Sequence, residues 1–211
     1  VHCDVGNACE KYPNFEPILR SRYLRAAIDY AIDRKQLAEV RGGGNPARFR
    51  ISSSFKEALP EFYGESANIY DPEMAKAYID EWRSLHQKPE DFKPEIVLSA
   101  PQEGKLGMEG DIAQVVADML EEVGFEVELE IMGFDAYREQ ILGKGLNRDL
   151  MINTLSQSLP RTALFYMCDW SEPQYRYCDP ELDRIIKKLR GSTEEETRTE
   201  LFKEFERRWV W

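Results

Sequence analysis

The sequence contains no long hydrophobic run. None of its apolar stretches approaches the roughly 18 residues that a transmembrane helix requires. Residues 1–4 also lack the charged start and the apolar middle of a signal peptide. We therefore predict that the chain as it stands is soluble, and that any targeting segment has been removed or lies outside these 211 residues.

Positive charge is scarce as well. The chain has 28 Lys and Arg residues against 39 Asp and Glu, which gives a formal net charge of -11. This charge repels a phosphate backbone and anionic lipid headgroups. The basic doublets at 187–188 and 207–208 lie among acidic residues of predicted helices, where a solvated face is the ordinary outcome. We expect no nucleic-acid partner.

Catalytic motifs are missing, and histidine is rare. The sequence has no GxSxG and no HExxH, and the residues around Gly104 do not form a P-loop because Leu106 follows Lys105. His2 lies near two cysteines, but there is no CxxC and the second histidine, His86, is remote. We therefore expect neither an enzyme nor a metal site, and no cofactor.

The four cysteines form two local pairs. Cys3 and Cys9 flank one short loop, and Cys168 and Cys178 flank another. Sequential pairing is the simplest of the three connectivities. Closing loops of this size would stabilise the fold by roughly 2 to 3 kcal/mol each. Two such disulfides would indicate an oxidising compartment.

The first regular element is an amphipathic segment. Across residues 21–37, apolar positions 24, 27, 28, 31 and 32 recur at helical spacing. A long loop follows from residue 41 to residue 64, because its glycines and proline break regular structure. Asp71 and Pro72 then form a helix start, and the buried face is predicted to consist of Met74, Ala77, Tyr78 and Trp82.

The middle of the chain alternates strands and helices. Strands are predicted at 96–100, 125–131 and 150–155, with helices at 112–123 and 134–142 between them. This β-α-β-α-β order favours a parallel sheet. Two helices end the chain, the first capped by Asp179 and the second by a capping box of Ser192 and Glu195.

Several blocks resemble family 5 extracellular solute-binding proteins, the peptide receptors of ABC importers. Residues 21–37 are similar to "VRQALNYAIDREAL", residues 42–47 to "GxGxPA" and residues 70–77 to "YDPEKAKALL". Residues 120–129 are similar to "LKEAGIKVEL", and residues 177–183 to "YSNPEFDKLL". The blocks occur in the family's order, and the similarity covers roughly residues 15–208.

The resemblance implies an α/β lobe of the periplasmic-binding-protein type II kind, with a short, mostly parallel sheet flanked by helices. Residues 1–20 would be an irregular lead-in and residues 21–211 the second lobe of a two-lobed receptor. The implied function is solute binding for ABC import, in the periplasm or outside the cell, with lipoprotein anchoring as an option. The implied partners are a peptide or small-molecule ligand, the missing N-terminal lobe and an ABC permease.

Ligand-binding residues are expected at the carboxyl ends of the strands. Peptide-binding members carry a motif like "WxADYPDP" after the third strand, whose aspartate pairs with the ligand's ammonium group. Here Ser158 stands at that position, which weakens the peptide assignment, and Arg161 could favour an anionic group. Trp170 could stack on a sugar or pack on a peptide side chain, or it could bury against the lobe's own core. The full predicted set is Gln102, Ser156, Gln157, Ser158, Arg161 and Trp170.

A sensory or interaction module built on the same lobe is the alternative function. Nothing within the lobe separates it from a transport receptor. A complete reading frame would, because a lipoprotein signal and a flanking first lobe favour transport, whereas a transmembrane helix joined to a kinase favours sensing.

Overall fold

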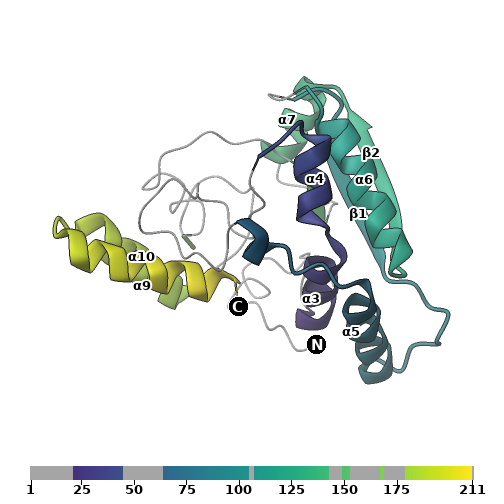
Figure 1. Cartoon of the computed structure of the whole chain (residues 1–211), viewed down its shortest axis with the longest axis horizontal. Coiled ribbons are helices and arrows are strands. Elements are labelled where there is room, and N and C mark those ends of the chain that lie inside the picture. The colour runs from purple at the N-terminus through teal and green to yellow at the C-terminus, as the bar shows by residue number, and fades with distance from the viewer. Residues whose placement is uncertain are drawn as a thin grey trace.

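The computed structural model describes residues 21–44, 64–104, 107–142, 149–152, 167–168 and 179–210. These residues form an α/β unit and a pair of C-terminal helices beside it (Figure 1). The elements in chain order are α3 (Arg22–Ala31), α4 (Arg34–Val40), η2 (Gly64–Ala67), α5 (Pro72–Leu85), β1 (Glu95–Pro101), α6 (Glu109–Glu122), β2 (Glu126–Met132), α7 (Phe134–Leu142), β3 (Leu150–Met151), α9 (Pro180–Gly191) and α10 (Glu195–Val210).

The sheet is parallel, as the alternation of strands and helices predicts. Its order is β2-β1-β3, with β1 in the centre. The β1–β2 register runs from Glu95 opposite Glu126 to Pro101 opposite Met132. The predicted third strand is described only in part: β3 covers Leu150 and Met151, and the Ile152 N–H continues the bonding to β1. The remainder of the predicted strand lies outside the described residues.

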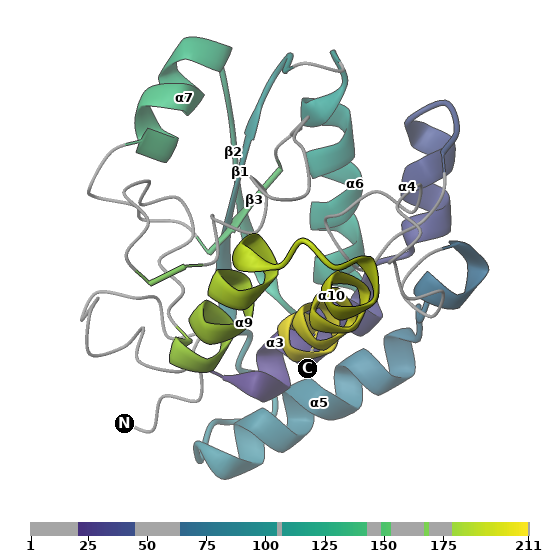
Figure 2. The same cartoon turned by 90° about the vertical axis from the view of Figure 1, so that its left-hand side faces the viewer.

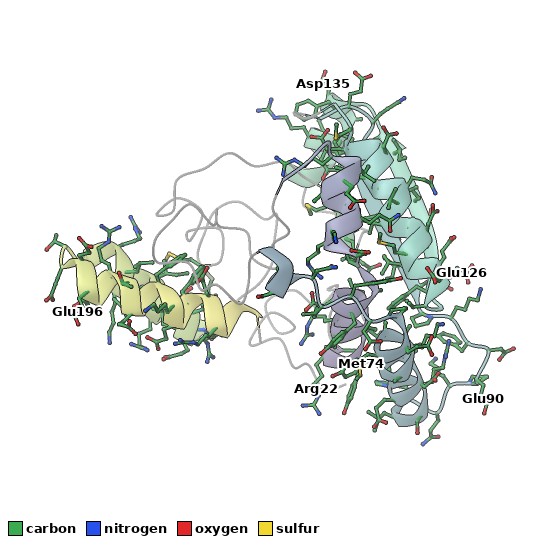
Figure 3. All side chains as sticks on the ribbon, in the orientation of Figure 1. Arg22, Met74, Glu90, Glu126, Asp135 and Glu196 are labelled. Carbon is green, nitrogen blue, oxygen red and sulfur yellow. The ribbon has the colours of Figure 1, made fainter. Side chains whose placement is uncertain are left out.

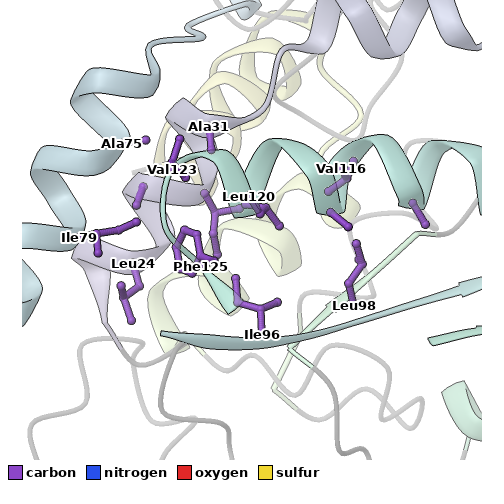
Figure 4. Close-up of a cluster of buried hydrophobic side chains, with 14 of the residues drawn as sticks. Leu24, Ala31, Ala75, Ile79, Ile96, Leu98, Val116, Leu120, Val123 and Phe125 are labelled. Atoms are coloured by element: carbon purple, nitrogen blue, oxygen red, sulfur yellow. The ribbon is translucent and has the colours of Figure 1, made fainter. Parts of the chain in front are cut away.

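Helix α6 packs its apolar stripe on one face of this sheet, and α7 lies on the other side of the strands (Figure 2). The predicted stripe of α6 is confirmed at Val116, Leu120 and Val123, which are buried in one cluster; Val116 faces Leu98 of β1, and Val123 lies beside Ala31 of α3 (Figure 4). Gly124 follows the C-cap residue Val123 and stops the helix, because its φ of +108° is a left-handed conformation that glycine adopts without strain.

Helix α5 begins as predicted, because the Asp71 carboxylate accepts a hydrogen bond from the Met74 N–H at 2.9 Å. The prediction for its buried face is confirmed in part at Tyr78 and Trp82, which pack against the core, and is wrong at Met74 and Ala77. Ala75 and Ile79 are buried, whereas Met74 is 43% exposed. The predicted Ala77 is exposed as well, and Tyr78 and Trp82 are half-buried beside the stripe. Helix α5 packs mainly on α3, so only the side chains that face α3 are fully buried.

The opening segment forms two helices instead of the one predicted. The Asp33 carboxylate accepts hydrogen bonds from the N–H groups of Lys35 and Gln36, so it caps a second helix where the first would continue. Arg34 binds the carbonyl oxygens of Asp29 and Ile32 at 3.0 and 3.3 Å and forms an ion pair with the Asp29 carboxylate. The family-like string "AIDR" is therefore a helix-to-helix turn, held by its own side chains.

The glycines after α4 act as a helix stop. Gly42 has a φ of +82°, its N–H donates to the Glu39 carbonyl, and the Gly43 N–H donates to the Ala38 carbonyl at 2.8 Å. These two bonds are the Schellman arrangement, which satisfies the last carbonyl groups of a helix. Residues 45–63 of the predicted long loop lie outside the described part of the chain.

Helices α9 and α10 pack side by side (Figure 1). Their facing side chains, such as Ile185 and Phe202, are fully buried. The predicted capping box does not form. Ser192 instead ends α9, because its N–H donates to the Lys188 carbonyl oxygen. Helix α10 begins at Glu195, and the Arg198 N–H donates to the Glu194 carbonyl oxygen.

Candidate ligand-binding site

The carboxyl ends of the three strands lie at one edge of the sheet. β1 ends at Pro101, β2 at Met132 and β3 at Met151. Ligands of open α/β sheets bind outside such an edge. Figure 3 shows Asp135, just after β2, at this edge and Glu126 at the opposite end. The residues that follow the strands are therefore the candidate ligand-binding residues.

Gln102 is the described member of the predicted ligand-binding set. It is exposed at this edge, and its backbone N–H donates to the Met132 carbonyl oxygen at 2.7 Å, so its position is set by the end of β2. The other predicted residues lie outside the described part of the chain, so their role stays a prediction; they are Ser156, Gln157, Ser158, Arg161 and Trp170.

The loop after β1 is closed by a buried carboxylate. Glu109, the first residue of α6, is 1% exposed. Its Oε2 accepts hydrogen bonds from the N–H groups of Gly104 at 2.9 Å and Met108 at 3.2 Å. Any side chain at residue 104 would overlap this carboxylate. The sequence analysis did not predict this contact. The glycines at 104, 107 and 110 around Glu109 could have indicated it, because glycine leaves room for a close approach of the carboxylate.

The ends of β2 and β3 are joined by a tyrosine on α7. Tyr137 is 1% exposed, and its hydroxyl donates to the Ile152 carbonyl oxygen at 2.6 Å. A buried tyrosine hydroxyl normally finds such a partner. Ile152 is the last described residue before the segment that carries Ser158. Tyr137 was not among the predicted site residues, because an aromatic residue at helical spacing indicates only a core position.

A second segment with a predicted ligand residue is attached to α9. Cys168 is disulfide-bonded. Its N–H donates to the carboxylate of Asp183, a buried residue of α9, at 2.9 Å. This contact holds the chain two residues before Trp170. Cys3, Cys9 and Cys178 lie outside the described residues, so both predicted pairings stay predictions.

Asp179 links the two C-terminal helices. Its carboxylate accepts hydrogen bonds from the Glu181 and Leu182 N–H groups and forms an ion pair with Arg208 at 2.6 Å. Burial raises the pKa of Asp179, but the hydrogen bond from Arg208 and those from the two N–H groups outweigh it, so the pKa lies below its usual value. The sequence predicts that Asp179 caps α9, but it does not predict the ion pair with Arg208, which lies 29 residues away.

Other kinds of site find no support in the described residues. Within them, no three His, Cys, Asp or Glu side chains are grouped to hold a metal ion. No helix of this part of the chain has both the length and the hydropathy to span a bilayer. A hollow of about 470 Å³ lies along α10, lined by Glu196, Glu200 and Arg207 among others, and not along the strand ends.

A family model matches most of the chain. Residues 8–171 match the model described as bacterial extracellular solute-binding proteins, family 5, middle. The match includes the whole parallel sheet and its carboxyl edge. No curated protein matches the sequence.

Solved structures share the fold at low sequence identity. AppA of Clostridium difficile, described as peptide-binding, is 17% identical with a TM-score of 0.78, covering 93% of this chain and 40% of that one. AppA of Bacillus subtilis, solved with a nonapeptide, is 20% identical with a TM-score of 0.73, covering 95% and 41%. NikA of Staphylococcus aureus, solved with Ni(L-His)2, is 16% identical with a TM-score of 0.73, covering 90% and 40%. The chain thus spans about 40% of the length of these proteins.

Proposed function

The chain belongs to the bacterial extracellular solute-binding proteins of family 5, and from that premise we propose that it is one lobe of a two-lobed receptor that binds a peptide or related small molecule for import by an ABC permease. The observation that carries the proposal is the family match over residues 8–171. The chain covers only 40% of the length of the solved relative AppA of Clostridium difficile, which supports the presence of a second lobe in the complete receptor. Residues 21–211 would form the lobe, and residues 1–20 its lead-in.

The proposed location is outside the cytoplasm. The disulfide-bonded state of Cys168 supports it, because structural disulfides persist in oxidising compartments. We expect Cys168 to pair with Cys178, and Cys3 with Cys9. A thiol titration of the unfolded, unreduced protein should therefore find no free thiol, and four free thiols would contradict both the pairing and this support.

The ligand is proposed to lie at the carboxyl edge of the sheet, in contact with Gln102 and with the predicted residues Ser156, Gln157, Ser158, Arg161 and Trp170. A neutral hydroxyl at Ser158 offers an ordinary hydrogen bond where a carboxylate would offer a charge-assisted one. The receptor is therefore proposed not to depend on a free peptide N-terminus. The relatives' described ligands, a nonapeptide and Ni(L-His)2, name two classes to test.

Native mass spectrometry of the chain with a random nonapeptide mixture, the same mixture N-acetylated, and Ni(L-His)2 tests this proposal. We expect saturable but weak peptide binding, with dissociation constants of about 0.1 to 1 mM, because one lobe supplies only part of the contacts. Acetylation should leave the binding unchanged. No saturable binding of any probe would contradict solute binding, and peptide binding lost on acetylation would contradict the role given to Ser158.

A pair of glutamine variants tests the location. Gln102→Ala removes an exposed amide at the carboxyl edge and should weaken peptide binding by about fivefold, the usual effect of one hydrogen bond. Gln114→Ala removes an exposed amide on α6 that contacts Asp118, away from the strand ends, and should leave binding unchanged. Equal affinities of the two variants would place the ligand elsewhere.

A further inference from the structure

The end of β3 has an unusual hydrogen-bond arrangement. The Ile152 N–H donates to the Ser99 carbonyl oxygen of β1 at 2.9 Å, which is a normal bond of a parallel ladder. The next bond of that ladder would run from the N–H of residue 101 to the Ile152 carbonyl oxygen. Residue 101 is Pro101, which has no N–H to donate. β1 therefore cannot donate a hydrogen bond to the Ile152 carbonyl oxygen.

Tyr137 supplies the missing donor. Its hydroxyl lies 2.6 Å from the Ile152 carbonyl oxygen, and its ring is among the largest fully buried side chains. The α7 backbone is itself anchored close to the sheet, because the Tyr137 N–H donates to the Gly133 carbonyl, one residue after β2. Both backbone polar groups of Ile152 are thus held, one by β1 and one by α7.

We propose that Tyr137 is a positioning residue for ligand binding at the carboxyl edge of the sheet, because by replacing the bond that Pro101 cannot make it fixes the Ile152 carbonyl group at the end of β3. This proposal rests on the proposed function. Without the hydroxyl, the Ile152 carbonyl group would need a water molecule or a new direction, since Ile152 is half-buried and a carbonyl group shielded from water is costly to leave unbonded. Tyr137 itself need not touch the ligand.

The pairing of Tyr137 with Pro101 gives a specific test. Tyr137→Phe keeps the buried ring and removes only the donor, so amide exchange of Ile152 should accelerate by about fivefold to tenfold. Pro101→Ala returns an N–H at the point from which the ladder bond would run. The double variant should therefore exchange nearly as slowly as the unaltered chain.

Ser99→Ala is the matched control. It also removes a buried hydroxyl bond, from Ser99 Oγ to Glu130 at 2.9 Å, but leaves the Ile152 carbonyl group untouched. It should lower the urea midpoint without accelerating amide exchange of Ile152. Equal acceleration in Ser99→Ala, or no rescue by Pro101→Ala, would mean that Tyr137 acts only through general packing and would overturn the proposal.

Binding of the nonapeptide mixture provides the functional readout. We expect Tyr137→Phe to weaken binding by about fivefold and the Pro101→Ala double variant to recover it. Faster exchange with unchanged affinity would overturn the positioning role. If the unaltered chain bound no probe, the proposed function would fail, whereas the exchange and rescue comparison would still decide whether Tyr137 fixes the end of β3.

Discussion

Asp179 connects the start of α9 with the end of α10, so its ionisation contributes to stability. Its pKa lies below the usual value because the bonds from Arg208 and two backbone N–H groups outweigh the effect of burial. A carboxyl group whose pKa is lower in the folded than in the unfolded chain stabilises the fold at any pH above its unfolded value, about 3.9. That contribution is lost as the pH falls through the folded pKa.

The variant Asp179→Asn separates the ion pair from the cap, because asparagine caps a helix about as well as aspartate. We expect a loss of about 1 kcal/mol in the free energy of unfolding at pH 7, a modest value because the Arg208 side chain is 43% exposed. The loss should shrink below pH 4. Urea unfolding at pH 7 and pH 3 measures it, with the exposed Glu90→Gln as a control of little effect. An equal loss at both pH values would refute the ion-pair interpretation.

Gly104 leaves room for the Glu109 carboxylate, and a Cβ at this position would overlap it. We expect Gly104→Ala to break the hydrogen bonds to Gly104 and Met108 and to lower the free energy of unfolding by about 1 to 3 kcal/mol, the cost of a buried carboxylate with poor partners. Gly133→Ala is the control, because a Cβ at residue 133 would meet no atom within 4 Å and the φ there is not positive. Similar urea midpoints for both variants would contradict this account.

At the scale of elements, the sequence predicts most of what local chemistry decides. The stripe of α6, its stop at Gly124 and the caps at Asp71 and Asp179 depend on residues close in the chain, and all are confirmed. The break after Ala31 was missed because Ile32 continues the apolar period, whereas the capping bonds of Asp33 decide against it. Periodicity cannot weigh two short helices against one long one when a capping residue stands in the middle.

Arg34 should be the most sensitive residue of this helix-to-helix turn. Arg34→Lys keeps the charge but cannot reach the carbonyls of Asp29 and Ile32 together with the Asp29 carboxylate, since lysine lacks the planar fork of arginine. We expect a loss of about 1 to 2 kcal/mol in the free energy of unfolding. The exposed Arg41→Lys serves as the control and should change it little. A loss shared by both variants would show a general effect of arginine content.

At the scale of the whole molecule, the edge of the sheet is predictable but its side-chain contacts are not. The strand order places Gln102, Met132 and Ile152 at one edge, which the β-α-β-α-β alternation already implies. The bonds from Tyr137 to Ile152 and from Cys168 to Asp183 span 15 residues each across different elements. No local pattern encodes them, because each depends on how two finished elements pack.

The net charge of -11 also acts through particular neighbours. Glu95 and Glu126 are exposed and directly opposite in the parallel register, whereas Glu128, also exposed, is opposite Val97. Adjacent strands lie about 4.8 Å apart, so the first pair repels at close range. Glu126→Lys and Glu128→Lys change the net charge equally, which cancels the long-range part of the effect.

Glu126→Lys should therefore be the more stable of the two, by about 0.5 kcal/mol in 10 mM salt, because it replaces a repulsive cross-strand pair by an attractive one. The difference should fall at 0.5 M salt, where the screening length drops to a few ångströms. Urea unfolding of both variants at the two salt concentrations measures it. Equal stabilities in low salt would mean that the repulsion is spread over the whole acidic surface and not concentrated where Glu95 meets Glu126.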